Sequence, residues 1–416
     1  MSEGPLFTND AVVLGILMML LGFVFWSSHS KIPAFKKFYS VVPALLVCYF
    51  LPSVFSTLGI ISGEESRLYF VSSRYLLPTS LVLLTLSIDF KGIWNLGPKA
   101  LIMFFTGTVG IVIGGPLAIL AVSVVSPDMV GGQGPEAVWR GMTTVAGSWI
   151  GGGANQTAMK EVFEVGDDIF SAMVAVDVIV ANIWMAVLLF AAGRSASIDA
   201  KTGADASAID ALKQKMEDFH ARTAQMPTLP DTMKILAVGF GATALAHAGA
   251  DVIAPWIENS APHLSRFSLT SHFFWLVVIA TSVGMVLAVT QARNLEGVGA
   301  SRIGSALLYV LIASIGMKMN IMAIFESPGF FVLGLIWMAI HATLMIVVAK
   351  LIKAPVFFMA VGSQANVGGA ASAPVVASAF HPSLAPVGVL LAVLGYALGT
   401  YAAWFCGQIM RVVAGG

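Results

Sequence analysis

The chain has 416 residues, of which 57% are hydrophobic and 11% are charged, and its 22 basic residues balance its 22 acidic ones. Soluble proteins carry about 25% charged residues, so this composition excludes an ordinary soluble domain and predicts an integral membrane protein. The balanced charge gives no indication of a nucleic-acid partner, and the lipid bilayer is the partner that composition predicts.

Twelve apolar runs approach or exceed the roughly 20 residues that a membrane-spanning helix needs. In chain order they cover residues 11–27, 39–60, 69–88, 99–125, 139–164, 168–192, 233–257, 272–290, 303–325, 328–352, 355–379 and 383–411. The segment before the first run lacks a basic stretch and a cleavage site, so we expect that run to be retained. The sequence predicts an all-α membrane protein with about 11–13 transmembrane helices.

One substantial polar segment separates the two halves of this series. Within it, four apolar residues recur at helical spacing among charged ones: Ile209, Leu212, Met216 and Phe219. This pattern predicts a short amphipathic helix that lies on the membrane or on the protein surface. We therefore expect a first half at 1–192, a polar linker at 193–231 and a second half at 232–416.

The distribution of basic residues in short loops predicts which ends of the helices are cytoplasmic. The basic residues that mark such ends are Lys31, Lys36, Lys37, Lys91, Lys99, Arg293, Arg302, Lys350, Lys353 and Arg411. This pattern needs an odd number of crossings between residues 139 and 192, whereas that region contains two apolar runs. A re-entrant segment, a different division of the runs, or a linker that departs from the rule would each remove the conflict.

Two polar, glycine-rich stretches interrupt apolar runs and resemble each other. They span residues 147–158 (GSWIGGGANQTA) and 362–373 (GSQANVGGAASA), and they align without a gap. Broken helices at matching places in two halves of a membrane protein are the best sequence pointer to a transporter's binding site. The alternative is chance similarity between helices that are rich in glycine and alanine.

Asp177 is the strongest candidate for a functional residue, because it lies deep in an apolar run. A carboxylate there costs several kcal/mol unless it is paired or hydrated. The alternative is a protonated, purely structural aspartate, and the matching position of the second half is Ala392. We expect Asp177 to couple an ion, with a sodium site at Asn155, Asp177 and Asn366. Other candidate ligands of ion or solute are Ser148, Gln156, Thr157, Asn182, Ser363, Gln364 and Ser372.

Enzyme signatures are absent from the sequence. It has no His-Glu-x-x-His, no Gly-x-Ser-x-Gly, no phosphate-binding loop and no cysteine pairs at zinc spacing. We therefore expect no catalytic residues and no cofactor besides a coupling ion, sodium or a proton. His341 lies in the middle of an apolar run and is interpreted as a hydrogen-bonded core residue.

The most specific parts of the two breaks are residues 147–155 and 365–370, and they resemble an uncharacterised family of polytopic membrane proteins. Plant members of this family are labelled keratinocyte-associated-like, and the resemblance covers nearly the whole chain. The family is similar in layout to the group of bile acid–sodium symporters, glutamate–sodium symporters and cation–proton antiporters.

That resemblance implies two inverted repeats with two discontinuous helices, at 139–164 and 355–379, that cross at mid-membrane. It also implies a moving core and a static panel, usually within a homodimer. The core would comprise residues 69–191 and 302–411, and the panel residues 11–60 and 233–290.

We therefore expect a secondary active transporter, with the bacterial cytoplasmic (inner) membrane as its location. It would couple sodium to symport of a small polar or anionic solute, such as an amino acid, a short peptide or a carboxylate, by an elevator-like movement. The alternatives are a sodium–proton antiporter without an organic substrate, which the lone Asp177 disfavours, and a proton-coupled solute transporter. A passive channel or a membrane-embedded enzyme forms a third class.

Overall fold

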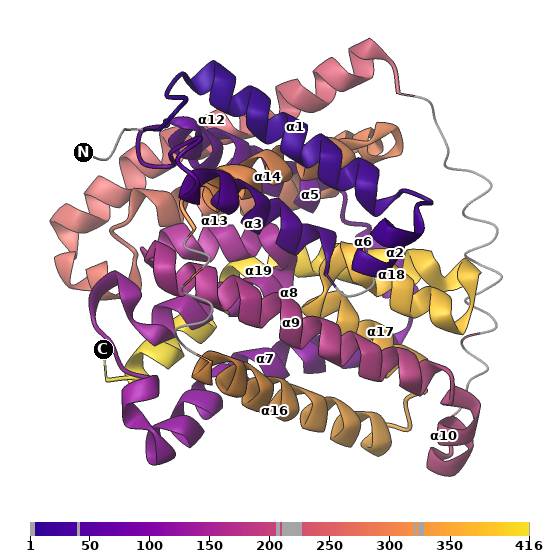
Figure 1. Cartoon of the computed structure of the whole chain (residues 1–416). Helices are drawn as coiled ribbons and strands as arrows, with labels where there is room; N and C mark the ends of the chain where they lie inside the picture. Colours follow the sequence, from indigo (N-terminus) through magenta and orange to yellow (C-terminus); the bar gives the residue numbers. More distant parts are fainter. Residues whose placement is uncertain are drawn as a thin grey trace.

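The computed structural model describes residues 5–39, 42–204, 209, 227–319, 322 and 328–415, and within these residues the regular elements are all helices (Figure 1). All-α architecture is therefore confirmed for the described part of the chain. The predicted amphipathic helix of the linker lies outside the described residues, apart from Ile209.

The helices follow the apolar runs. The first half contains α1 (Asp10–Ser28), α2 (Pro33–Tyr39), α3 (Ala44–Thr57), α4 (Leu68–Val71), the π-helical turn η1 (Ser72–Leu76), α5 (Leu77–Leu86), α6 (Phe90–Trp94), α7 (Pro98–Val125), the 3-10 turns η2 (Pro127–Met129) and η3 (Gly134–Glu136), α8 (Val138–Val162), α9 (Asp167–Ala192) and α10 (Ser195–Thr202). The second half contains α12 (Leu229–Ser260), η4 (Pro262–Phe267), α13 (His272–Ala288), η5 (Gln291–Val298), α14 (Ala300–Gly316), α16 (Gly329–Leu351), α17 (Val356–Val367), α18 (Gly369–Phe380), η6 (Pro382–Leu384) and α19 (Ala385–Val413).

Six described helices are long and apolar enough to cross a membrane: α1, α7, α9, α12, α16 and α19 with η6. The number rises to eight if two bent pairs, α2 with α3 and α13 with η5, each form one span. This is fewer than the predicted 11–13, because several apolar runs form short or interrupted helices, such as α14, α17 and α18.

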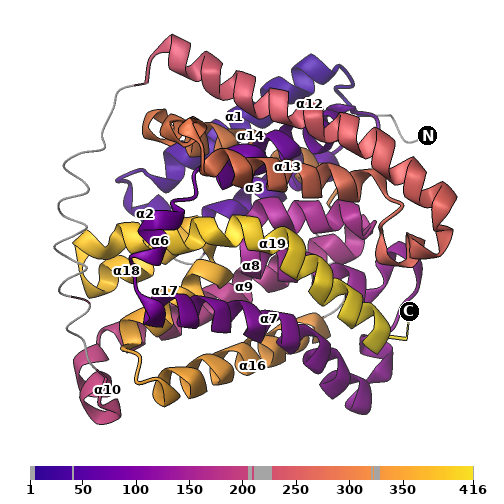
Figure 2. The ribbon, with the colours of Figure 1, turned by 180° about the vertical axis from the view of Figure 1, so that it is seen from behind.

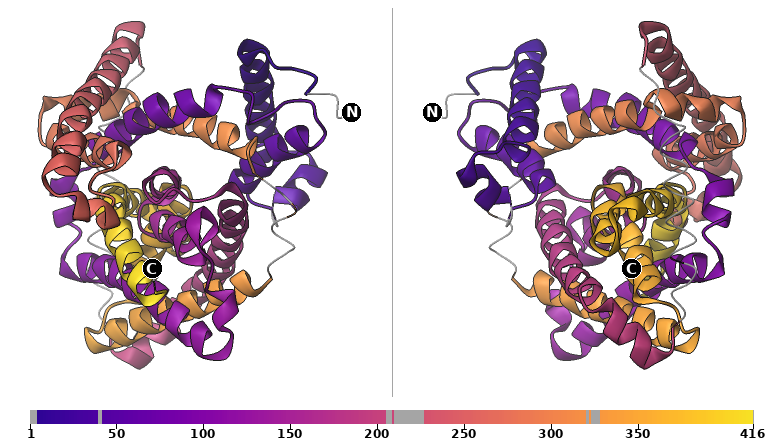
Figure 3. Two further views of the ribbon diagram at one scale, coloured as in Figure 1. Left: turned by 90° about the vertical axis from the view of Figure 1, so that its left-hand side faces the viewer. Right: turned by 90° about the vertical axis from the view of Figure 1, so that its right-hand side faces the viewer.

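The helices pack in two groups, which Figure 3 shows above and below each other. The first group contains α1, α3, α5, α12, α13 and α14, and the second contains α7, α8, α9, α16, α17, α18 and α19. Figure 2 shows α19 between the α12–α13 pair and the α7–α16 pair. The division into core and panel stays a prediction; of the helices that it placed in the core, α5 packs here on α12 and α13, and α14 packs on α5, α3 and α1.

Several contacts that helices of the first half make resemble contacts that helices of the second half make. In the first group, α5 packs on α12 and α13, while α14 packs on α1 and α3. In the second group, α8 packs on α19, while α17 and α18 pack on α9, and α7 packs on α16. Several contacts of the first half therefore have a counterpart in the second, whereas the contact of α17 with α7 has none among the stronger contacts.

The segment α8 folds back on itself at Gly152, whose φ of 72° and ψ of −173° are not helical. The rings of Trp139 and Phe163, at the two ends of the segment, lie 5.9 Å apart. The guanidinium of Arg140 donates a hydrogen bond to the carbonyl of Phe163. Residues 138–162 thus form a helical hairpin, called here the first hairpin.

Residues 356–380 form the second hairpin. Its arms are α17 and α18, it turns at Gly369 with a φ of 58°, and the rings of Phe357 and Phe380 lie 5.3 Å apart at its base. A Cβ added to Gly369 would lie 3.8 Å from the Cα of Gly152, so the two tips meet. The prediction that these segments cross as discontinuous helices is therefore corrected: each one turns back, because a glycine in a non-helical conformation reverses the chain.

The bases of the two hairpins lie at opposite ends of the molecule. These ends are called here the Arg411 end and the Lys353 end. At the Arg411 end, the backbone N–H of Gly166, just before α9, donates to the carbonyl of Pro135 at 2.9 Å. At the Lys353 end, beyond α9, Asp199 accepts from the N–H of Val356 at 2.9 Å. Helix α9 runs about 39 Å between these ends.

This geometry removes the conflict over the linker. Because the first hairpin turns back, α9 is the one candidate span between residues 139 and 192, which is the odd number that the charge pattern needs. The prediction that Arg411 and Lys353 both mark cytoplasmic ends is wrong, since Arg411 lies beside Arg140 at the end opposite Lys353.

Candidate functional site

A cavity of about 360 Å³ lies where the tips of the two hairpins meet. Its lining comes from both groups: α14 and the start of α3 on one side, and the hairpins, α9 and α19 on the other. The polar residues that line it are Ser148, Asp177, Asn182, Ser305, Tyr309, Gln364, Ser372 and Tyr396. None of the described residues that line the cavity is basic.

Asp177 is 3% exposed and lines this cavity from α9. Its Oδ2 accepts a hydrogen bond of 2.8 Å from Nε2 of Gln156, whose Oε1 accepts one of 3.2 Å from the hydroxyl of Tyr49. Ser148 and the indole N–H of Trp149 also lie beside the carboxylate, although Trp149 makes no hydrogen bond of normal geometry. No described basic side chain forms an ion pair with Asp177, so a proton or a bound cation must balance its charge.

Gln364 approaches the same cavity from the second hairpin and is 1% exposed. Its Nε2 donates to the hydroxyl of Ser372 at 2.7 Å, but its buried Oε1 has no hydrogen-bond partner. Leaving a buried acceptor unpaired costs about 1–3 kcal/mol. This oxygen lies at the wall of a cavity, where it is available to a donor or a cation.

Asn155 lies in the first hairpin and does not line the cavity. Its Nδ2 donates to the carbonyls of Gly151, at 3.1 Å, and Tyr396, at 3.0 Å. Its Oδ1 accepts from the hydroxyl of Thr400 at 2.7 Å. The bonds to Tyr396 and Thr400 hold the hairpin against α19, and we call the arrangement of all three bonds an asparagine clamp.

Asn366 forms the same clamp in the second hairpin. Its Nδ2 donates to the carbonyls of Gly362 and Phe104, both at 2.9 Å, and its Oδ1 accepts from Thr108 at 2.8 Å. In both clamps the outside partners are a carbonyl and a hydroxyl four residues apart on one helix. The predicted sodium site requires Asn155, Asp177 and Asn366 to lie around one cavity. In the structure Asp177 lines the cavity, whereas the two asparagines do not.

The other predicted residues also divide into those that line the cavity and those that bond elsewhere. Ser148, Asn182 and Ser372 line the cavity, and the hydroxyl of Thr157 bonds to carbonyls of its own helix. Ser363 lies outside the cavity, where it accepts from Nε1 of Trp184 at 2.8 Å.

His341 is buried and hydrogen-bonded, as predicted. Its Nδ1 lies 3.1 Å from the carbonyl of Gly107, which can only accept, so Nδ1 carries the proton. Its Nε2 therefore accepts from the hydroxyl of Ser363 at 2.8 Å. Each polar atom of this network has a partner, which makes His341 a structural residue.

Sequence reasoning missed several residues at this site. Tyr309 and Tyr396 line the cavity, and Thr108 and Thr400 complete the clamps. The threonines were visible only as polar residues in apolar runs, and hydroxyls in membrane helices usually bond to their own backbone.

The long apolar helices, the two hairpins and the buried carboxylate define a polytopic integral membrane protein. The chain belongs to the family described as "Protein of unknown function (DUF819)", which it matches over residues 15–413. It is 24% identical over 381 residues to the "Uncharacterized membrane protein YjcL" of Bacillus subtilis (strain 168), covering 89% of this chain and 91% of that protein. The predicted membrane class and its uncharacterised family are confirmed, whereas the similarity to symporters and antiporters stays a prediction.

Proposed function

We propose that the protein is a secondary active transporter whose solute and coupling ion bind in the cavity between the hairpin tips. The observation that carries this proposal is the meeting of two interrupted segments at a cavity that holds Asp177 and the unpaired Oε1 of Gln364. Irregular backbone at membrane depth is tolerated where it lines a cavity, and transporters place their binding sites at such interruptions.

The matched neighbours of the two halves support an inverted repeat. In the proposed topology each half contributes five crossings: α1, α2–α3, α4–α5, α7 and α9 in the first, and α12, α13, α14, α16 and α19 in the second. Each half also contributes one hairpin, and the hairpins enter from opposite sides. The excess of lysine and arginine at the Lys353 end supports a cytoplasmic linker.

The position of the cavity between the two helix groups supports an elevator-like movement of the second group against the first. Polar contacts join the groups at separate points, among them Tyr49 to Gln156 at 3.2 Å, Ser282 to Tyr401 at 2.7 Å and the ion pair of Arg74 with Glu161 at 2.7 Å. Such contacts can be exchanged for others when one group slides. The homodimer that the resemblance implies remains part of this proposal.

Sodium is the coupling ion that we propose. Asp177 and Gln364 offer oxygens that lack a cationic partner, and hydroxyls line the same space. The cavity lies at the small end of the roughly 300–1,000 Å³ that ligand pockets occupy, so it suits a solute the size of an amino acid. Sodium–proton exchange without an organic substrate and proton-coupled uptake are the alternatives, and the role of a transporter rather than an enzyme is itself part of the proposal.

Thermal unfolding in detergent, with sodium compared with choline, tests the ion site directly. A ligand at 100 times its dissociation constant stabilises by about 2.7 kcal/mol, so we expect a sodium-specific rise of the melting temperature. Asp177→Asn should lose this rise, whereas Asp128→Asn, a matched control in the exposed loop after α7, should keep it.

Two results would reject sodium at Asp177. A pH-dependent stabilisation that is lost in Asp177→Asn, without any sodium effect, would assign proton coupling. Identical responses of both variants and the wild type would leave Asp177 structural.

A further inference from the structure

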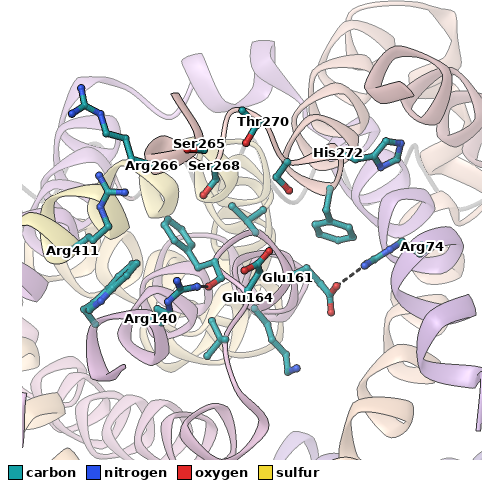
Figure 4. Close-up of a pocket in the computed structure, with 17 residues that line it drawn as sticks. Arg74, Arg140, Glu161, Glu164, Ser265, Arg266, Ser268, Thr270, His272 and Arg411 are labelled. Atoms are coloured by element: carbon teal, nitrogen blue, oxygen red, sulfur yellow. Dashed lines mark hydrogen bonds and ion pairs between the residues drawn. The ribbon is translucent and has the colours of Figure 1, made fainter. Parts of the chain in front are cut away.

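A second and larger cavity lies at the Arg411 end, at the base of the first hairpin (Figure 4). Its volume is about 860 Å³. Its walls come from the two ends of the first hairpin, the C-terminal turn of α19, the connection between α12 and α13, and Arg74 of η1. It therefore lies between the two helix groups, as the central cavity does.

The lining of this cavity contains more positive charge than its carboxylates balance. Arg74 pairs with Glu161 at 2.7 Å, and Lys160 pairs with Asp167 at 2.8 Å. Three further arginines line the cavity without an ion pair to any described carboxylate: Arg140, Arg266 and Arg411. The lining carboxylate that remains is Glu164, so the unpaired groups carry an excess of positive charge.

Aromatic rings hold these arginines in place. The guanidinium carbons of Arg266 and Arg411 lie 4.7 Å and 5.6 Å from the centre of the Phe267 ring. The carbonyl of Phe267 accepts from Nε1 of Trp404 at 3.0 Å, which fixes the loop. Arg140 lies 5.1 Å from the ring of Trp139. Arg140 is also held by its hydrogen bond to the carbonyl of Phe163, so the three charges are positioned without acidic partners.

Two observations favour an anionic ligand in this arrangement. The Nε of Arg411 is buried and has no hydrogen-bond partner, and the charges of Arg266 and Arg140 act on Arg411. Like charges in a partly enclosed space repel one another, and an anion between them removes that repulsion. A favourable position in the last turn of α19 accounts for Arg411, but not for Arg140 or Arg266.

The topology adds an independent argument. In the proposed orientation the Arg411 end faces away from the cytoplasm, where lysine and arginine are normally scarce. The same end carries acidic residues, such as Asp128, Glu136 and Asp168. A cluster of three unpaired arginines among them runs against the charge bias and calls for a specific reason.

We propose that Arg140, Arg266 and Arg411, with the hydroxyls of Ser265 and Ser268, form a binding site for an oxyanion. Guanidinium groups bind carboxylate and phosphate oxygens through two parallel hydrogen bonds, and serine hydroxyls complete the set of donors. The oxyanion belongs to a small solute at the outer face or to the headgroup of an anionic lipid. The second arm of the first hairpin, residues 153–162, connects this site with the central cavity over about 14 Å.

Binding measured on the whole protein in detergent tests the site. The probes are inorganic phosphate and citrate, compared with chloride at equal ionic strength, and the readout is the melting temperature. A parallel series uses nanodiscs of phosphatidylcholine with and without phosphatidylglycerol. The variants are Arg266→Gln and Arg411→Gln, and the control is Arg67→Gln, another arginine without an ion pair to a described residue but outside the cavity.

We expect an anion to raise the melting temperature of the wild type and of Arg67→Gln, and to lose most of this effect in the two cavity variants. A response to phosphate or citrate assigns the site to a free solute, whereas a response to phosphatidylglycerol alone assigns it to a lipid headgroup. Equal responses in all variants, or none in the wild type, would overturn the proposal. Asp177→Asn should respond like the wild type, which separates this site from the proposed transport site.

Discussion

The two hairpins share their framework and differ in the chemistry beside it. Both turn at a glycine with a positive φ, and both are fixed by an asparagine clamp. Beside the first hairpin, Gln156 bonds to the ionisable Asp177, whereas Ser363 of the second bonds to the fully satisfied His341. The shared features are those that a tight helical hairpin needs, so the unshared Asp177 is where function is expected.

The first prediction concerns a variant that removes the ionisable group beside the first hairpin. In proteoliposomes with an inward sodium gradient, Asp177→Asn should reduce solute uptake to background, because the neutral amide cannot balance the charge of a bound cation. His341→Gln, in the network beside the second hairpin, should retain uptake. Comparable loss in both variants, with normal folding by size-exclusion chromatography, would show that the two networks have equal roles.

The second prediction concerns the similarity of the clamps. Asn155→Ala and Asn366→Ala each remove three hydrogen bonds and leave buried carbonyls unpaired, so each should destabilise by about 3 kcal/mol. Thermal unfolding in detergent measures this, with Asn95→Ala, at the end of the short helix α6, as the control. If one clamp variant is neutral, the hairpins are not anchored in the same way.

The third prediction tests the turns. Gly152 adopts a combination of φ and ψ that is essentially restricted to glycine, so Gly152→Ala should destabilise by about 1–3 kcal/mol. Gly369, in the left-handed region, should tolerate alanine better, at about 1–2 kcal/mol. The control is Gly22→Ala in α1, where an added Cβ meets nothing within 4 Å. A larger loss at Gly369 would reverse the order of strain in the two tips.

The fourth and smallest effect concerns the base of the second hairpin. Burial raises the pKa of Asp199 above its ordinary value, and the hydrogen bond from the N–H of Val356 opposes this. Because the folded-state pKa is the higher one, stability should fall slightly as the pH rises from about 4 through that value. Asp199→Asn should flatten this dependence in pH-scanned unfolding, whereas an unchanged slope would assign it to another group.

The membrane class, the two breaks and Asp177 could all be read from the sequence, because each rests on local composition. The direction of the chain after each break could not, since a glycine allows departure from a helix without specifying the φ of 72° that Gly152 adopts. The role of Asn155 was also hidden, because its partners Tyr396 and Thr400 lie 241 and 245 positions away. A polar side chain at a break looks the same whether it anchors the backbone or binds an ion.

The reversal of the first hairpin has a consequence for how such a chain could have arisen. In the proposed topology, a half turns back once and crosses five times, so it begins and ends on opposite sides of the bilayer. Two tandem copies of that half therefore insert with opposite orientation, without an additional helix between them. An ancestral half-length protein that inserted both ways would have formed the same interfaces as an antiparallel dimer, and gene fusion through the polar linker would then have fixed which copy faces the cytoplasm.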